Sequence, residues 1–471
     1  MESLEMGVAT SQERVGALAS AGRQLMGFSK KVTAKVVEVA KKVMKLGQDD
    51  PRRVVHSLKV GFALSLVSLI YYLQPLYNSF GINAMWAVMT VVVVFEFYVG
   101  ATLGKGLNRG LATLLAGALG VGATHLASLT GKTGEPIMLG FFVFLQAAGT
   151  TFVRFFPRIK AKYDYGMLIF ILTFALVSVS GFREDKIVEF AHKRLSTVVI
   201  GGSACLIISI IVCPVWAGED LHLLIASNME KLANFLEGFE VEYLGESEDG
   251  DSNRDKSLFQ EYKSVLGTKS KEESLANFAS WEPCHGPFGF RHPWKQYLKV
   301  GASIRQCAYR IEALEGYLTT KFQAPPQVQT RLKEFCAEMA MEAAEALRQL
   351  SSSLKTMATP SSAIPHLEKS RTAAKALKSL LKTTSWKDAT DLLAVVHATT
   401  VTSLLIDITD CTDKIAESVN ELASLTGFKT AEKAKKHLKC DEVVLTVTAP
   451  EVTVSSENGS PLVKSPPAPV L

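Results

Sequence analysis

Two basic residues stand at helical spacing between long apolar runs of the sequence. Lys105 and Arg109 lie four residues apart in GATLGKGLNRG, so an α-helix would place both side chains on one face. Holding such a side chain at the centre of a membrane costs about 2.5–3.5 kcal/mol on insertion scales, and it therefore faces a polar cavity, a partner or the interface. Two interpretations are open. The two residues could reach the interface with Glu96 as a counter-ion, or they could line a wet path for anions, because pores select anions with cationic side chains.

A second group of charges precedes the last apolar run. Its basic members are Arg183, Lys186, Lys193 and Arg194. Cations at both ends of one path would attract an anion and pass it on. Asp185 and Glu189 lie among them, and on a helix their spacing would bring the two carboxylates together. The pair could bind a hard multivalent cation through oxygen, or it could form salt bridges with the neighbouring basic residues.

The sequence offers no recognisable spacing for catalysis or for a bound cofactor. Its nine histidines form no HExxH motif, no GxxxxGK[ST] loop occurs, and its seven cysteines form no CxxC pair. We therefore expect no enzyme activity, no cofactor and reduced thiols. The net charge of +5 is small for 471 residues and requires no nucleic-acid partner.

Six apolar stretches could carry these charges across a membrane. A span needs about 20 residues to cross roughly 30 Å of hydrocarbon. The predicted spans are 56–73, 82–99, 101–129, 136–155, 163–181 and 195–216. Lys105 and Arg109 then fall within the third span, and Arg194 stands at the entrance to the sixth.

Lysine and arginine in the short loops orient the spans. Basic residues gather before the first span, in KKVTAKVVEVAKKVMKLGQDDPRR, and between the fourth and fifth, in RFFPRIKAKYD, whereas the loop QPLYNSFG has none. We therefore expect a cytoplasmic N-terminus. An even number of spans places the C-terminal half in the cytoplasm as well.

Beyond the spans, long amphipathic stretches at helical periodicity predict a bundle. The expected fold is an all-α membrane protein with six transmembrane helices followed by a cytosolic helical bundle domain. Its four parts are a basic cytosolic segment (1–53), an anion-conducting membrane domain (54–217), a cytosolic helical domain (218–428) and a disordered tail (429–471).

Several long motifs resemble those of the plant aluminium-activated malate transporter family. They include GINAMWAVMTVVVVFEF (81–97), GATLGKGLNRG (100–110), FVRFFPRIKAKYDYG (152–166) and WEPCHGPFGFRHPWKQY (281–297). The resemblance covers the chain from Asp50 to about Phe428. It implies a homodimeric anion channel in the lipid membrane, with six spans per subunit, that passes malate and often chloride or nitrate.

The resemblance also implies roles for individual residues. Those that would line the conduction path are Lys105, Arg109 and Arg194, with Met89 nearby on the second helix. The charge cluster before the sixth span adds Arg183 at the outer entrance of this path. Acidic residues for sensing external Al³⁺ would fall in two outer loops: Asp185 and Glu189 in the third, and in the first Asn78, where some relatives have an aspartate. An amide binds Al³⁺ more weakly than a carboxylate. Trp281, Glu282 and Pro283 form the WEP motif of the cytosolic domain.

The expected function is passive, gated efflux of malate. Moving one charge across the membrane is worth about 2.3 kcal/mol per 100 mV, so a dianion leaving an inside-negative cell gains about twice that. We expect the plasma membrane rather than the vacuolar membrane, because no obvious vacuolar extension precedes the first span. The alternatives are a proton-coupled organic-anion carrier and a non-transporting scaffold whose helical domain binds partners.

Overall fold

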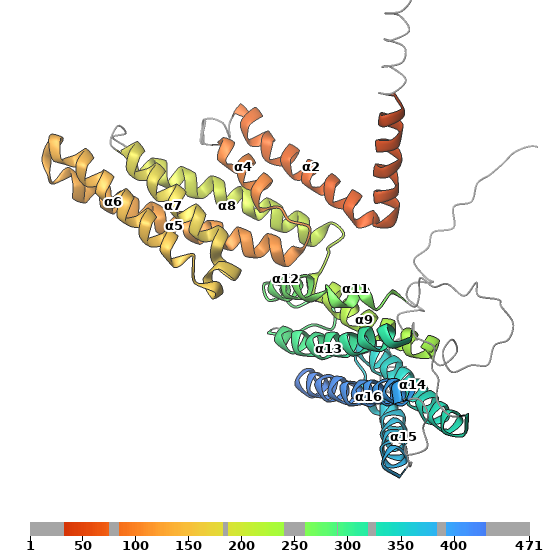
Figure 1. The fold of residues 1–471 in the computed structure, drawn as a ribbon. Coiled ribbons are helices and arrows are strands. Elements are labelled where there is room, and N and C mark those ends of the chain that lie inside the picture. Colours follow the sequence, from red (N-terminus) through yellow and green to blue (C-terminus); the bar gives the residue numbers. More distant parts are fainter. Residues whose placement is uncertain are drawn as a thin grey trace, which may run out of the picture. The chain divides into compact units, whose positions relative to one another are not determined.

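The computed structural model describes residues 33–74, 84–181, 187–239, 260–289, 291–318, 326–383 and 392–429. These residues form α-helices joined by short connections and one 3₁₀ helix (Figure 1). They divide into two compact units. The first comprises residues 1–224 and 268–298, and the second comprises 225–267 and 299–471.

The first unit contains the apolar helices. Their bounds are α2 (Pro51–Tyr72), α4 (Met85–Val94), α5 (Val99–Ser128), α6 (Gly131–Val153), α7 (Pro157–Gly181) and α8 (Ile187–Ile211). All of them except α4 contain a stretch long and apolar enough to cross a membrane. Five of the six predicted spans are thereby confirmed, although α8 begins eight residues earlier than expected.

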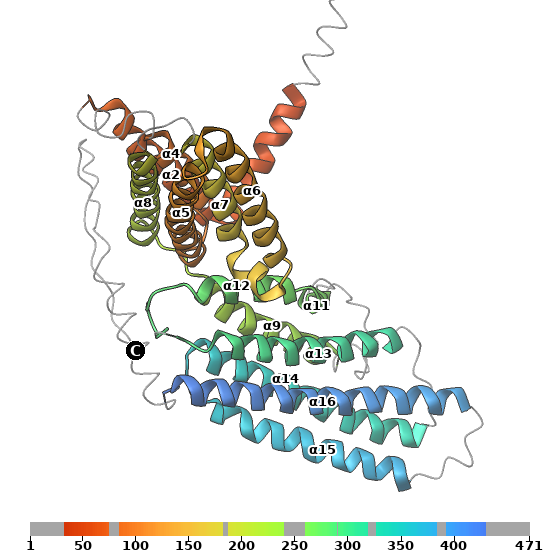
Figure 2. The ribbon, with the colours of Figure 1, turned by 90° about the vertical axis from the view of Figure 1, so that its left-hand side faces the viewer.

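Helix α5 is at the centre of this bundle. It packs against α7, α8 and α6, while α4 packs between α2 and α8 (Figure 2). Small residues allow the close contacts. At Gly120 of α5, an added Cβ would lie 2.9 Å from Val177 Cγ1 of α7, so only glycine fits without displacement of a neighbour.

The prediction of a continuous second span over 82–99 is wrong at its C-terminal end, because α4 ends at Val94. Phe95 is extended, with φ −73° and ψ 106°, and α5 starts only at Val99. A run of valines followed by aromatic residues has low helix propensity. The break also has tertiary partners for its backbone: Glu96 N donates to Thr102 Oγ1 (3.0 Å) and Val99 N donates to Val215 O (3.1 Å). Irregular backbone at membrane depth requires such partners.

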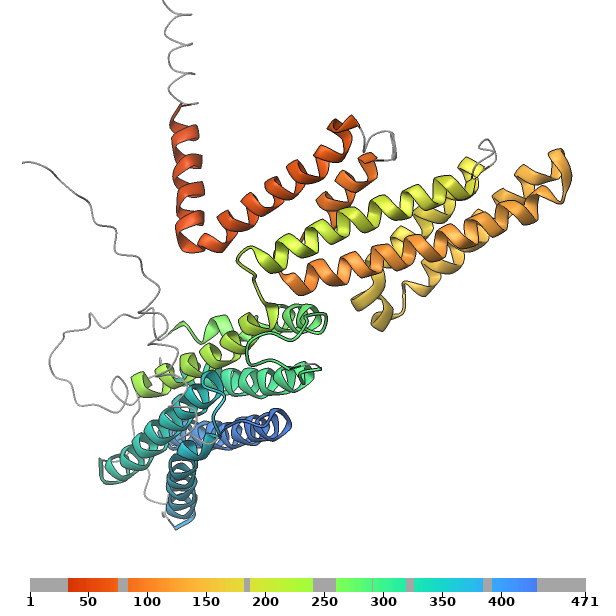
Figure 3. The ribbon, with the colours of Figure 1, turned by 180° about the vertical axis from the view of Figure 1, so that it is seen from behind.

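Further segments complete the first unit. They are residues 33–49, which are helical, the first turns of α9 (Ala217–Phe239), α12 (Lys269–Ala279), the WEP segment, and the start of α13 (Trp294–Leu318). Figure 3 shows the helix of residues 33–49 turning into α2.

The second unit is a helical bundle. It contains the remainder of α9 and α13, α11 (Lys263–Leu266), α14 (Pro326–Lys355), η3 (Pro360–Ala363), α15 (Ile364–Thr383) and α16 (Leu392–Thr426). Helix α14 packs against both α15 and α16. Fully buried side chains such as Phe235, Ile304 and Leu347 form its core. The predicted amphipathic stretches thus form helices, while the tail expected to be disordered lies outside the described residues from 430 onward.

Candidate functional site

Two arginine side chains are buried in the bundle of apolar helices. Arg109 of α5 is 5% exposed and Arg194 of α8 is 2% exposed. Helix packing brings their elements together, because α8 packs against both α5 and α4. At Gly201 of α8, an added Cβ would lie 2.6 Å from the carbonyl oxygen of Ala87 in α4, so these two helices touch backbone to backbone. Because α8 begins at Ile187, Arg194 lies about two turns inside this helix. The sequence had predicted a position at the entrance to the sixth span.

Among the described residues, each arginine contacts an aromatic side chain. Arg109 Nη1 donates a hydrogen bond to the hydroxyl of Tyr165 in α7 at 2.9 Å. The Arg194 guanidinium lies over the indole of Trp86 in α4, with Cζ 4.0 Å from the ring centroid. A cation over a desolvated aromatic face gains about 2 kcal/mol. Neither contact neutralises the positive charge.

The hydrogen-bonding capacity of the two guanidinium groups is only partly used. Among the described residues, Arg109 Nε, Arg194 Nε and Arg194 Nη1 are buried without a hydrogen-bond acceptor. Neither arginine forms an ion pair with a described acidic residue, and the charge of Arg109 repels that of Arg194. A buried charge that lacks a partner costs several kcal/mol. An anion between the two groups would accept the free donors and remove the repulsion.

Lys105 differs from the two arginines. Its ammonium group pairs with the Glu96 carboxylate, and both side chains are about one-third exposed (36% and 38%). This contact agrees with the interpretation in which Glu96 is the counter-ion. Lys105 Nζ also lies 5.8 Å from the centroid of the Tyr165 ring, which shows that Lys105 and Arg109 share one face of α5, as their spacing predicted.

The WEP segment binds the beginning of α9. The Glu282 carboxylate accepts hydrogen bonds from the amides of Ala217 (2.6 Å) and Gly218 (3.1 Å). These are orphan donors at a helix N-terminus, where a negative charge is favourable. The Glu282 side chain is 1% exposed. Burial raises the pKa of its carboxyl, although the two amides act in the opposite direction.

Trp281 packs against the N-terminal ends of α5 and α7. An added Cβ at Gly104 of α5 would lie 3.0 Å from the indole ring. Lys162 Nζ of α7 lies 4.7 Å from the ring centroid, and Asn277 Nδ2, just before Trp281, donates to the carbonyl of Ala161 (3.1 Å). The WEP segment thus connects α5, α7 and α9 within the first unit.

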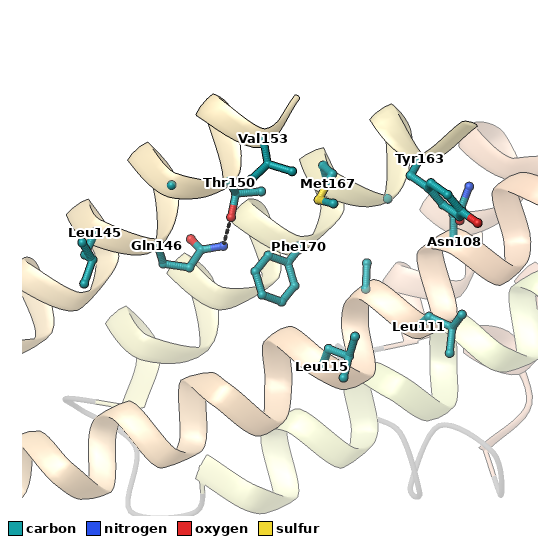
Figure 4. Close-up of a pocket in the computed structure, with 13 residues that line it drawn as sticks. Asn108, Leu111, Leu115, Leu145, Gln146, Thr150, Val153, Tyr163, Met167 and Phe170 are labelled. Carbon is teal, nitrogen blue, oxygen red and sulfur yellow. Dashed lines mark hydrogen bonds between the residues drawn. The ribbon is translucent and has the colours of Figure 1, made fainter. Parts of the chain in front are cut away.

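A cavity of about 530 Å³ lies between α5, α6 and α7. Figure 4 shows Leu111 and Leu115 of α5 facing Leu145 of α6 and Phe170 of α7 across it. Polar groups are few, and Gln146 Nε2 donates to Thr150 Oγ1 at 3.2 Å. The lining is apolar and carries no charged side chain, so it does not suit an anion.

A model of one protein family, described as aluminium activated malate transporter, matches residues 44–387. The chain belongs to the aluminium-activated malate transporter family. It is 58% identical over 406 residues to aluminum-activated malate transporter 2 of Arabidopsis thaliana, covering 85% of this chain and 81% of that protein. It is 45% identical over 441 residues to aluminum-activated malate transporter 1 of Triticum aestivum, covering 92% and 95%.

Membership agrees with the apolar helices: the chain is a multi-pass membrane protein of a family of transporters, not enzymes. The matched region contains Arg109, Arg194 and the WEP motif. Among the residues that the structure describes, no group of three or more histidine, cysteine or acidic side chains is placed to hold a metal ion.

The aluminium-sensing residues expected from the family resemblance are only partly described. Asn78, Arg183 and Asp185 lie outside the described residues. Glu189 is described, and its carboxylate pairs with Lys193 Nζ at 2.8 Å across one helical turn. This contact agrees with the salt-bridge interpretation of the acidic pair. Met89 lies on α4, one turn after Trp86, and is 53% exposed.

Sequence reasoning missed Trp86 and Tyr165. Both are aromatic residues within apolar stretches, where a core or interfacial position is the usual expectation. Trp86 is far from Arg194 in the sequence, and only the packing of α4 on α8 brings them together. Tyr165 lies in YDYG, next to Asp164, which is the charged residue of that stretch. Asp164 pairs with Arg154 at 2.8 Å rather than with Arg109.

Proposed function

We propose that this chain is an anion channel that mediates passive, gated efflux of malate, and of anions such as chloride or nitrate. The observation that carries the proposal is the pair of buried arginines, Arg109 and Arg194. They repel each other and retain unused donors, with no acidic partner among the described residues. The printed names of the relatives, which call them malate transporters, support malate as the substrate.

The proposed mechanism is electrostatic. A dianion has no route through hydrocarbon, because the loss of its hydration is too costly. Guanidinium donors replace that hydration: each presents a planar fork that matches a carboxylate. Arg109 and Arg194 then hold a carboxylate in transit, and the membrane potential drives it, at about 2.3 kcal/mol per charge per 100 mV. No coupling ion is required for efflux.

Purified full-length protein in liposomes tests the class of activity. We expect a malate conductance that depends on voltage. The flux should not show saturating, proton-dependent kinetics and should not require a pH gradient. Flux that requires a pH gradient would instead establish a proton-coupled carrier. Folded protein without any anion flux would establish a scaffold.

Arginine variants in the same liposomes test the site. Arg109→Lys and Arg194→Lys keep the charge but lose the planar fork, and we expect each to reduce malate flux by about tenfold, equivalent to one hydrogen-bonded contact of about 1.4 kcal/mol. Arg158→Lys is the matched control, because Arg158 is an exposed arginine at the start of α7. Equal flux from all three variants would contradict the assignment.

The proposal has four further parts. They are activation by external Al³⁺, location in the plasma membrane, cytoplasmic termini and a homodimeric assembly. Domain boundaries near residues 54, 218 and 428 are part of it. For aluminium, Asp185→Asn and Glu189→Gln are expected to reduce the current evoked by Al³⁺ without reducing the basal malate current. Recording from intact cells with and without external Al³⁺ measures both, and an unaltered aluminium response in both variants would remove these residues from the proposal.

A further inference from the structure

The helix of residues 33–49, directly before α2, carries an unusual surface. Every residue from 33 to 46 is exposed. Large apolar side chains are among them: Val36 is 60% exposed, and Val43 and Met44 are each 62% exposed. An exposed apolar surface of this kind marks a site of interaction with a protein or a membrane.

The helix places its large apolar side chains and its charged side chains on opposite halves. At 100° per residue, the large apolar side chains and Ala40 fall on one half of the circumference, while Ala34 lies on the charged half. These are Val36, Val37, Val39, Ala40, Val43, Met44 and Leu46. The opposite half holds the charged residues Lys35, Glu38, Lys41, Lys42, Lys45 and Asp49. Lys42 Nζ pairs with Glu38 at 2.7 Å along that polar half, so three further lysines remain to give it a positive charge.

The position of the helix on the chain indicates what covers its apolar face. Asp50 alone separates it from α2; Asp50 is extended, with φ −148° and ψ 93°, and its side chain accepts a hydrogen bond from Arg52 N. Helix α2 has 22 residues and an apolar window that can cross a membrane. At 1.5 Å per residue it is about 33 Å long, close to the thickness of the hydrocarbon core, so its first residue lies near the headgroups. The C-terminal end of the preceding helix must therefore lie at the membrane surface.

We infer that the helix of residues 33–49 lies in the plane of the membrane interface, with its valine face in the acyl boundary and its lysines on anionic phospholipid headgroups. A helix with a strong apolar face and a lysine-rich polar face binds membranes in this way. Lysine side chains are long enough to reach headgroups while their stems contact apolar surface. Arg52 and Arg53 in the first turn of α2 are paired with acidic residues, Arg52 with Asp50 and Asp220 and Arg53 with Asp50, so the positive charge of this surface comes from the lysines. The inference requires only that α2 spans the membrane, so it does not depend on the proposed anion conduction.

Hydrogen exchange of the full-length protein in nanodiscs tests the inference. An isolated helix of this length is marginal in water and exchanges its amides rapidly unless it is bound. We expect exchange in residues 33–49 to be at least about tenfold slower in nanodiscs of phosphatidylcholine with phosphatidylserine than in phosphatidylcholine alone. The variant Lys41→Gln/Lys42→Gln/Lys45→Gln should lose this difference.

A matched variant, Lys375→Gln/Lys378→Gln/Lys382→Gln, removes the same charge from exposed positions of α15 and should keep the difference. All six substituted lysines are exposed, so we expect both variants to fold normally. Unchanged hydrogen exchange in α16 checks this expectation. Rapid exchange in both nanodiscs would overturn the inference. So would equal protection in both that also survives the lysine substitutions, because the lysines would then not hold the helix on anionic headgroups.

Discussion

The guanidinium of Arg194 lies over the indole of Trp86, 4.0 Å from the ring centroid, and this contact joins α8 to α4. A cation–π contact fixes the plane of a guanidinium without neutralising its charge. Arg194 is thereby held in place while its Nε and Nη1 remain available. A buried charge arranged in this way is suited to binding an anion reversibly.

Removing the indole should weaken anion binding by Arg194. We expect Trp86→Ala to raise the half-saturating malate concentration by roughly tenfold, since a desolvated cation–π contact is worth about 1–2 kcal/mol. Trp86→Phe, with a weaker π face, should have an intermediate effect. Concentration-dependent currents measure this, with Val92→Ala as the control at an exposed position of the same helix. A response of Trp86→Ala equal to that of the control would show that the indole only fills space.

The ion pair between Lys105 and Glu96 predicts effects of opposite sign. Glu96→Gln frees the ammonium group and should increase anion conductance, whereas Lys105→Gln leaves the Glu96 carboxylate without its counter-ion and should decrease it. The double variant should lie between the two. The expected changes are about two- to fivefold, because partly exposed pairs contribute about 0.2–1 kcal/mol. Single-channel conductance in malate is the measurement, and a decrease in both single variants would contradict the pairing.

Close packing of α5 on α7 predicts a strict requirement at Gly120. Gly120→Ala places a Cβ 2.9 Å from Val177 Cγ1, and overpacking of this kind costs about 1–3 kcal/mol. Gly122→Ala is the matched control, since an added Cβ there meets no atom within 4 Å. It should be neutral or stabilising by up to about 1 kcal/mol. Thermal unfolding in detergent measures both, and equal melting temperatures would contradict the packing.

The buried Glu282 predicts a pH dependence of stability. Burial raises the pKa of its carboxyl, with the amides of Ala217 and Gly218 opposing that rise. A carboxyl with a raised folded pKa favours folding while protonated, so its contribution is present below the unfolded pKa and declines as pH rises through the folded pKa. Glu282→Gln does not titrate. Its melting temperature relative to the native protein should therefore increase between mildly acidic and neutral pH.

Glu273→Gln, at an exposed position of α12, is the control for this titration and should show no such trend. A difference between Glu282→Gln and the native protein that stays constant across the same pH range would show that burial of Glu282 does not alter its titration.

The sequence predicted the features that depend on local composition. Apolar length defined five long helices, and the spacing of Lys105 and Arg109 placed both on one face, where each contacts Tyr165. Local patterns could not predict the break at Val94 fully, because one partner of the released backbone, Val215, lies far away in the sequence, while Thr102 is a nearby one.

The sequence also could not predict which residues surround each charged side chain. Lys105 and Arg109 have the same spacing and similar neighbours, yet one pairs with Glu96 while the other is buried against Tyr165. Trp86 and Tyr165 reach the arginines only through the packing of four helices. The contacts of Glu282 with the start of α9 are likewise tertiary, so the motif alone gave no physical role for its carboxylate.

The reversal potential of full-length protein under a malate gradient tests the central claim most directly. If Arg109 and Arg194 admit anions as proposed, the native protein should reverse near the malate equilibrium potential. Arg109→Gln/Arg194→Gln removes both charges and keeps a polar side chain at each position. The reversal potential of this variant should shift toward the equilibrium potential of the cations, with a large loss of current. If the double variant, folded and inserted, keeps the native reversal potential and conductance, the two buried arginines do not carry the anion.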